Sequence, residues 1–345
     1  DNRLSRLTRT AFLYTRRHLQ ALSAAGLPVR WGASGVLHLA RDKTHEQTQQ
    51  QVAQTFAAPD LFRFVDATEA SRLTGWDVKV GGWHFPGGGW GMPPSLCAAN
   101  LAACPEIRQQ YGIRVERLER EQTADGEAWV AYDAAGTPIA RADQVVLANA
   151  ADARRLGRCD WLPLRSARGQ TTLLPEQDTP PLNLVVCRLG YVTPAVDGLR
   201  VCGASFLAGD EGEEERLEEH RDNLAKLNFI LPGFAAGLTP ENVHGRVGFR
   251  PISPDRLPML GAVPVAPLPP ESHPKLHTLP RQPGLWLASG FGARGFVWSA
   301  WAGEFLASLM AGDPLPLEGD LADALDPARF LIKPPRQLRF GGDRE

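Results

Sequence analysis

The stretch GFGARGFVWSAWAGEFLASLMAG, residues 290–312, decides how the rest of the chain is interpreted. It opens with a Gly-x-Gly-x-x-Gly turn at Gly290, an apolar run over 284–289 precedes that turn, and a helical pattern follows it. A dinucleotide turn normally opens a strand–helix–strand unit, so a second parallel strand is expected next. Residues 311–330 are instead rich in turn residues. The glycines therefore predict either a packing turn or a place where backbone N–H groups meet an anion or a ring system.

The amino-acid composition limits the possible classes of protein but does not identify one. The chain has 345 residues, of which 43% are hydrophobic, so it can bury a core large enough for two domains or one interleaved domain. Its formal net charge of −2 argues against a protein that binds polyanions through bulk charge, although local basic patches remain compatible with it. No apolar run approaches a membrane span and no signal segment is recognisable, so we expect a soluble, cytoplasmic protein.

The cysteines and histidines carry no metal or disulfide pattern. The five cysteines form an odd set without a C-x-x-C pair, which favours reduced thiols acting as small buried hydrophobes. They are Cys97, Cys104, Cys159, Cys187 and Cys202. The eight histidines show no ligand spacing, so no metal site is expected.

The distribution of strand patterns predicts the fold class. Alternating strands dominate residues 113–140 and 165–206, whereas 143–150 is a short apolar run of the kind that is buried on both faces. Helices occupy much of the remainder. This mixture predicts a mixed α/β fold, in which a parallel-sheet domain is interleaved with an antiparallel-sheet domain.

Three local segments complete the expected organisation. Helical periodicity is already running at the first residues, and residues 80–95 are rich enough in glycine and proline to predict a loop. Residues 211–228 predict an acidic amphipathic helix, with Asp210 and Glu213 at capping-box spacing. Its negative charge is typical of a solvated helix face that suits the helix dipole, and a partner-binding acidic patch is the alternative.

Seven segments of the chain occur in the order found in one family of flavoenzymes. They are FPGGGWGMPPSL (85–96), VVLANA (145–150), GYVTP (190–194), CGASF (202–206), PDRLPMLG (254–261), RGFVWSAWAGEFLASLMAGDPLP (294–316) and LDPARFLIKP (325–334). Together they resemble the D-amino-acid-oxidase-like family of FAD-dependent oxidoreductases, which includes glycine and sarcosine oxidases. Within that family the chain is most similar to the oxidoreductase half of bifunctional enzymes that modify tRNA. The resemblance covers nearly the whole chain.

The resemblance implies a domain division and reveals one departure. It implies a discontinuous FAD-binding domain over 1–30, 86–165 and 251–345, and a substrate domain over 31–85 and 166–250. Members of the family begin with a strand, a Gly-x-Gly-x-x-Gly turn, a helix and a second strand. Nothing similar occurs before residue 30, so we expect the sequence to begin one βαβ unit late.

By resemblance, the opening loop is the C-terminal flavin loop of the family. Its N–H groups would face the flavin ring and stabilise the negative charge of the reduced form. The implied residues in contact with non-covalent FAD are Gly290, Phe291, Gly292, Ala293, Arg294, Gly295, Ala148, Asn149, Gly89 and Trp90. Trp90 would pack beside the flavin or roof the site, and a plain core tryptophan is the alternative.

The family reaction oxidises an amine that carries a carboxylate, so the substrate needs a carboxylate clamp. Arg250 matches the arginine of the family's G-x-R-P stretch, and a guanidinium can hold a carboxylate through two hydrogen bonds. Tyr191 would add a hydroxyl, and Arg294 would either touch the substrate or only brace the loop. The alternatives are a surface salt bridge for Arg250 and a half-buried strand residue for Tyr191.

The closer resemblance implies a tRNA substrate. The reaction would remove the carboxymethyl group from carboxymethylaminomethyl uridine at the wobble position, giving the aminomethyl base and glyoxylate. A methyltransferase half is expected upstream or as a separate protein. Candidate backbone contacts are Arg3, Arg6, Arg9, Arg16, Arg17 and the tail 333–339, with a solvated helix face as the alternative. Two other functions stay open: an oxidase of free glycine, sarcosine or D-amino acids, and a flavin-less remnant with a binding or scaffold role.

Overall fold

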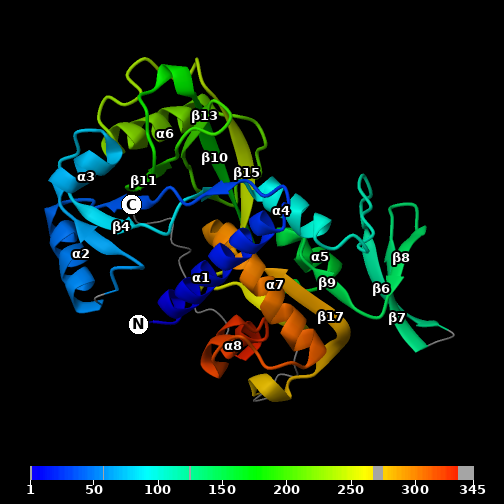
Figure 1. Ribbon diagram of the computed structural model, residues 1–345. Helices are drawn as coiled ribbons and strands as arrows, with labels where there is room; N and C mark the ends of the chain where they lie inside the picture. Colours follow the sequence, from blue (N-terminus) through cyan, green and yellow to red (C-terminus); the bar gives the residue numbers. More distant parts are fainter. Residues whose placement is uncertain (1, 57, 124–125, 267–274, 333–345) are drawn as a thin grey trace. The chain divides into compact units, whose positions relative to one another are not determined.

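The computed structural model describes residues 2–56, 58–123, 126–266 and 275–332, which fold into two compact units. The first unit contains Asp1–Leu27, Ala98–Ala167 and Arg250–Glu345, and the second contains Pro28–Cys97 and Arg168–Phe249 (Figure 1). Both units are discontinuous, because the chain passes between them four times. The boundaries differ from the expected domain limits mainly at residues 86–97, which group with the second unit.

Two long helices form the core of the first unit. Helix α1 (Arg3–Ala24) buries one residue on each turn, and α7 (Gly295–Ala311) packs against that face (Figure 1). The contact layer contains Leu7, Ala11, Trp298, Trp301 and Phe305. Asn2 caps α1 by accepting a hydrogen bond from the Ser5 amide, and Gly312 ends α7 in the left-handed region. Short helices α8 (Gly319–Leu325) and α9 (Arg329–Ile332) follow.

A small sheet carries the opening loop. Strand β17 (Arg281–Ser289) pairs antiparallel with β16 (Met259–Pro264) and parallel with β9 (Val145–Leu147). The expectation that residues 143–150 form a strand buried on both faces was wrong, because Leu147 is 3% exposed but Val146 is 40% exposed. Among the described residues β9 lies at one edge of this sheet, and the face that carries Val146 is not covered.

The remainder of the first unit is a separate antiparallel meander and its flanking turns. Strands β6 (Arg117–Thr123), β7 (Gly126–Tyr132) and β8 (Pro138–Ala142) pair in sequence order. Turn η1 (Ala150–Asp152) and helix α5 (Ala153–Leu156) follow β9, and turn η3 (Leu276–Thr278) precedes β17. A cluster around Trp129, Leu147 and Leu285 joins the meander to the small sheet.

The second unit is built on a larger mixed sheet. Among the described residues its strands run in the order β14-β10-β13-β12-β11-β2-β4-β3, and β15 pairs with β10. Their bounds are β2 Val36–Leu39, β3 Arg63–Val65, β4 Gly82–Phe85, β10 Arg165–Pro175, β11 Val185–Cys187, β12 Tyr191–Val192, β13 Leu199–Gly203, β14 Leu207–Ala208 and β15 His244–Ile252. A separate two-residue ribbon joins β1 (Trp31–Gly32) to β5 (Trp90–Gly91).

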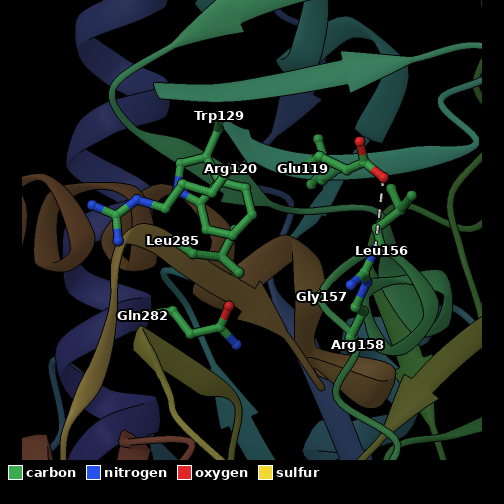
Figure 2. Close-up of a pocket in the computed structure, with 9 residues that line it drawn as sticks. Glu119, Arg120, Trp129, Leu156, Gly157, Arg158, Gln282 and Leu285 are labelled. Carbon is green, nitrogen blue, oxygen red and sulfur yellow. Dashed lines mark ion pairs between the residues drawn. The ribbon is translucent and has the colours of Figure 1, made fainter. Parts of the chain in front are cut away.

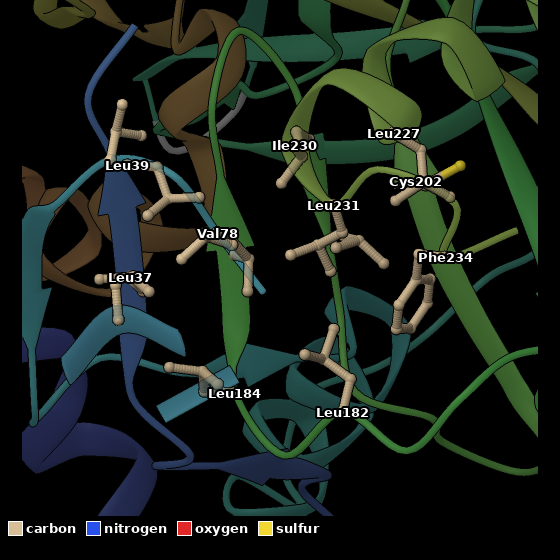
Figure 3. Packing of buried hydrophobic residues seen from close by; sticks show 14 of the residues in the cluster. Leu37, Leu39, Val78, Leu182, Leu184, Cys202, Leu227, Ile230, Leu231 and Phe234 are labelled. Carbon is tan, nitrogen blue, oxygen red and sulfur yellow. The ribbon is translucent and has the colours of Figure 1, made fainter. Parts of the chain in front are cut away.

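Helices cover this sheet and close its core. Helices α2 (Lys43–Phe56) and α3 (Ala67–Thr74) follow β2 and β3, η2 (Glu176–Asp178) follows β10, and α6 (Leu217–Ile230) lies against β12 and β13. Figure 3 shows leucines of β2 in one cluster with Leu227, Leu231 and Phe234, which come from α6 and the turn after it. Helix α4 (Pro93–Ala102) leads the chain toward the first unit.

Three local expectations need correction. The acidic helix begins at Leu217 and not at 211, because Asp210 and Glu214 bind the Arg216 guanidinium and hold the preceding segment in a bent loop. Residues 80–95 contain strands β4 and β5 within the expected loop. Cys97 and Cys104 are exposed, whereas Cys159 and Cys202 are buried as expected and Cys187 is half-buried.

Candidate functional site

The glycine loop connects the end of β17 to the start of α7. Gly290 follows the strand with φ +78°, a 3-10 turn covers Gly292–Arg294, and α7 begins at Gly295. The hydroxyl of Ser289, the last residue of β17, donates to the Ala150 carbonyl at 2.9 Å. This bond ties the loop to the segment that follows Ala148 and Asn149, so the two predicted cofactor segments of the first unit are adjacent.

The loop backbone leaves open space where a flat group could approach. Gly292 has φ +56°, and a Cβ added there would meet nothing nearer than Ile252 Cγ2 at 3.7 Å. Glycine is thus required at Gly292 by conformation and not by crowding. Gly290 also has a positive φ, and a Cβ there would lie 3.2 Å from the Met259 methyl group. Gly295 has a helical φ of −52°, so its backbone angle does not require glycine.

The N-terminus of α7 points its first amides into this loop. Arg294 occupies the N-cap position, and its side chain makes no capping hydrogen bond. The first amides of a helix have no intrahelical acceptor, and the helix dipole adds positive potential there. The loop and helix start therefore fit the electron-rich edge of a flavin ring, and these are the residues that would hold it.

Two arginines add positive charge to the loop. The Arg294 guanidinium lies 5.4 Å from the Trp298 ring centroid, and burial lowers its pKa, with a further contribution from the nearby charge of Arg256. Neither arginine forms an ion pair with an acidic side chain among the described residues. An arrangement of two like charges favours an anionic group as its neighbour.

Arg250 stands on a strand that borders the same loop. It belongs to the last residues of β15, is half-buried, and precedes Pro251. Two residues later, Ile252 forms an isolated β-bridge with Phe291 of the glycine loop. Because side chains alternate along a strand, Arg250 and Ile252 lie on one face of β15. The first unit thus brings the predicted clamp arginine and the predicted flavin loop together.

The remaining predicted residues belong to the second unit. Tyr191 is half-buried in β12, where it pairs with Cys187 on one side and Gly203 on the other. Position 89 must be glycine because of close packing, since a Cβ there would lie 1.8 Å from the Gly32 carbonyl oxygen. The clamp by Arg250 with Tyr191, and the flavin contacts of Gly89 and Trp90, stay predictions.

A polar pocket of about 280 Å³ opens in the second unit beside Trp90. Its base is Arg200, which is only 2% exposed. The guanidinium donates from Nε to Thr179 Oγ1 at 2.9 Å and from Nη1 to the Leu182 carbonyl at 3.3 Å. Burial lowers the pKa of Arg200 despite its distant pairing with Glu176. Sequence inspection missed this residue, because no pattern distinguishes a buried arginine from the many surface ones.

A second pocket, of about 410 Å³, lies in the first unit between the meander and β17. Figure 2 shows its apolar wall of Trp129, Leu156 and Leu285, and the ion pair of Glu119 with Arg158 at 4.0 Å. None of the residues predicted for the site lines it. The described residues also contain no cluster of three or more potential metal ligands and no helix long and apolar enough to span a membrane.

Comparison with known proteins gives consistent results. The family model described as FAD dependent oxidoreductase matches residues 2–309. The tRNA 5-methylaminomethyl-2-thiouridine biosynthesis bifunctional protein MnmC of Aromatoleum aromaticum is 53% identical over 344 residues, which are 99% of this chain and 53% of that protein. The protein of the same name from Azoarcus sp. is 51% identical over 98% of this chain and 53% of its own length. The chain thus spans about half the length of the curated relatives it matches.

Solved structures support the fold. Glycine oxidase from Geobacillus kaustophilus aligns with a TM-score of 0.72 at 21% identity, covering 92% of this chain and 82% of that one. Iminodiacetate oxidase from Chelativorans sp. BNC1 aligns with a TM-score of 0.68 at 23% identity, covering 89% and 80%. These values confirm the expected fold class of mixed α/β architecture.

Proposed function

Because the chain belongs to the FAD-dependent oxidoreductase family, we propose that it oxidises a secondary amine carrying a carboxymethyl group, with non-covalent FAD as the electron acceptor. The observation that supports this most directly is the arrangement in the first unit. An uncapped helix start, a glycine loop with open space before it and two unpaired arginines adjoin the strand that carries Arg250. When bound, FAD would supply the acceptor for the hydride.

The chain's own residues would orient the amine and favour charge separation. Arg250 would hold the substrate carboxylate through two hydrogen bonds, and the Tyr191 hydroxyl would donate to the same group. This fixes the carbon between the carboxylate and the nitrogen at the reacting position. The amides of Gly292–Gly295 and the charge of Arg294 would stabilise negative charge on the cofactor side. No general base is required if the amine binds unprotonated.

For the substrate, we infer carboxymethylaminomethyl uridine at the wobble position of tRNA. The relatives named for this pathway match almost the whole chain at 51–53% identity. Loss of hydride from the carbon alpha to nitrogen gives an imine, and water converts it to the aminomethyl base and glyoxylate. The methyltransferase that completes the base would be the other half of the bifunctional protein or a separate partner. A tRNA substrate also implies a cytoplasmic location.

Hypomodified tRNA provides the test. The whole FAD-loaded protein is incubated with tRNA that carries the carboxymethylaminomethyl base, and the nucleosides are measured by mass spectrometry. Peroxide release from free glycine and sarcosine is followed in parallel. We expect conversion of the tRNA and little oxidation of the free amines, since remote contacts with the nucleotide position the amine. Fast oxidation of free amines with unchanged tRNA would identify a small-molecule oxidase, and a colourless protein that binds no flavin would identify a remnant.

A further inference from the structure

The polar pocket beside Trp90 has no part in the proposed oxidation of the amine. It lies wholly in the second unit, and its polar lining includes Ser34, Glu176, Thr179, Asn183 and Arg200. Trp90 and the ring of Pro194 contribute flat and apolar surface. A pocket with one aromatic wall and convergent donors and acceptors is built for a planar polar ligand.

Trp90 is held in place from behind. A Cβ added to Gly32, its partner in the β1–β5 ribbon, would lie 2.8 Å from the Trp90 indole nitrogen, so the ring rests directly on the Gly32 backbone. The side chain is half-buried, and its indole N–H makes no hydrogen bond among the described residues. The ring is thus supported by the Gly32 backbone and still contributes surface to the pocket.

Arg200 supplies a fixed donor at the base of the same pocket. Its Nε and Nη1 atoms are anchored, but the nearest acceptor recorded for Nη2 within the described chain is a Glu176 oxygen at 3.9 Å, which exceeds a hydrogen bond. The Glu176 side chain is 55% exposed and adds an acceptor to the rim. Because one cation and one anion face the pocket, a phosphate gains little there, whereas a neutral ring with donor and acceptor edges matches both.

The size of the pocket restricts the ligand further. Its 280 Å³ is slightly below the roughly 300–1,000 Å³ that hold whole small-molecule ligands. The space suits one ring belonging to a larger molecule. We propose that it binds an unpaired nucleobase of the substrate RNA, a base other than the one that reacts, stacked on Trp90 with its edge hydrogen-bonded to Arg200. Single-stranded RNA loops are commonly recognised in this way. This inference rests on the proposed tRNA substrate.

A double-mutant cycle between protein and RNA tests the assignment. Binding of the FAD-loaded protein to a fluorescently labelled anticodon stem-loop is measured by anisotropy, with an abasic site placed at each loop position in turn. Loss of the stacked base should weaken binding to the wild-type protein by about 5- to 150-fold, or about 1–3 kcal/mol, at one position. In Trp90→Leu the same abasic site should have almost no further effect.

Two further variants make the outcome independent of folding defects. Gly32→Ala displaces the indole without removing it and should show the same loss of coupling. Trp286→Leu, which removes a half-buried tryptophan of the first unit, should leave the coupling as in the wild type. Flavin absorbance is recorded for each variant, because a spectral change in Trp90→Leu would place the ring beside the flavin and overturn the proposal.

The proposal of a nucleobase pocket would also be overturned if the effects of Trp90→Leu and of the abasic site on binding were additive at every loop position. Failure of the proposed function is a separate result. In that case the wild-type protein does not convert hypomodified tRNA at all. If the protein converts the tRNA but the effects of Trp90→Leu and of each abasic site are additive, the proposed function stands and only the nucleobase pocket is rejected.

Discussion

Arg168 donates a hydrogen bond to the Glu219 carboxylate, and both side chains are sealed from solvent inside the second unit. The same guanidinium donates to the carbonyl oxygens of Gly212 and Glu214, while the Ser205 hydroxyl donates to Glu219. One buried ion pair therefore fixes the loop between β14 and α6 at several points. Its partners are 51 positions apart in the sequence.

Breaking this pair should strongly destabilise the protein. Arg168→Met leaves the buried Glu219 carboxylate with only the more distant Arg216, at 3.9 Å, as a cationic partner. Removing the close partner of a buried ion pair costs about 3–5 kcal/mol. We expect a large fall in the urea midpoint, measured by circular dichroism. Arg30→Ala is the matched control, since Arg30 pairs with Asp197 at the surface and its loss should hardly change the midpoint. Equal midpoints for the two variants would show that Arg168 is not a structural anchor.

Gly292→Ala should separate flavin binding from stability. Alanine in the left-handed region costs about 1–2 kcal/mol, and the new methyl group enters the open space before the loop. We expect a modest fall in Tm together with a large loss of bound flavin, measured from the absorbance ratio of the purified protein.

Gly303→Ala is the control for this substitution. Gly303 lies inside α7, and a Cβ there meets nothing within 4 Å. Alanine in a helix interior is favoured over glycine by about 1 kcal/mol, so Tm should rise and the flavin content should stay constant. A Gly292→Ala protein that retains full flavin would remove this loop from the cofactor site.

The sequence predicted which helices and strands form better than where they begin and end or which of their faces are buried. The glycine loop, the helix after it and the α1 helix are as expected, because strong apolar periodicity and glycine turns act locally. The exposed face of β9 was not predicted. An apolar run shows that a strand can be buried on both faces, but it does not show whether other elements pack against both of them. The capping box at Asp210 failed because Arg216 competes for the same carboxylate.

Predicted site residues lie close together where a motif constrains the backbone, whereas buried polar residues that depend on tertiary contacts were not predicted. The glycine loop and the neighbouring Arg250 come from motifs, and the structure brings them together in the first unit. Arg168 and Arg200 are buried by strands that are distant in sequence, so nothing local marks them. Their burial is visible only once the sheet register is known.

Arg250→Lys should preserve the flavin and impair the reaction. Lysine keeps the charge but cannot form the two parallel hydrogen bonds of a guanidinium with a carboxylate. Loss of one charged hydrogen bond, about 1.5–3 kcal/mol, corresponds to a fall of about 10- to 150-fold in kcat/KM. Arg246→Lys, an exposed arginine on the same strand, should leave kcat/KM unchanged. Wild-type kinetics in Arg250→Lys would exclude Arg250 from the substrate site.

Some arginines on α1 form ion pairs with acidic side chains, and others have no such partner in the described part of the chain and could contact phosphate groups. Arg3 and Arg6 form ion pairs with Asp320, and Arg6 also lies 3.8 Å from Glu318. Arg16 and Arg17 have no acidic partner among the described residues. Of the five arginines predicted to contact tRNA, these two are the strongest candidates, and the predicted tail contacts at 333–339 lie outside the described residues.

Salt dependence should distinguish the two groups. Each phosphate contact that is lost lowers the slope of log affinity against log salt by about 0.7–0.9, because fewer counterions are released. We therefore expect Arg16→Gln and Arg17→Gln to weaken tRNA binding and reduce this slope, measured by anisotropy between low and physiological salt. Arg6→Gln is the matched control on the same helix, and it should leave the slope unchanged because Asp320 and Glu318 already neutralise that charge. An equal slope in all three variants would show that α1 does not contact the RNA backbone.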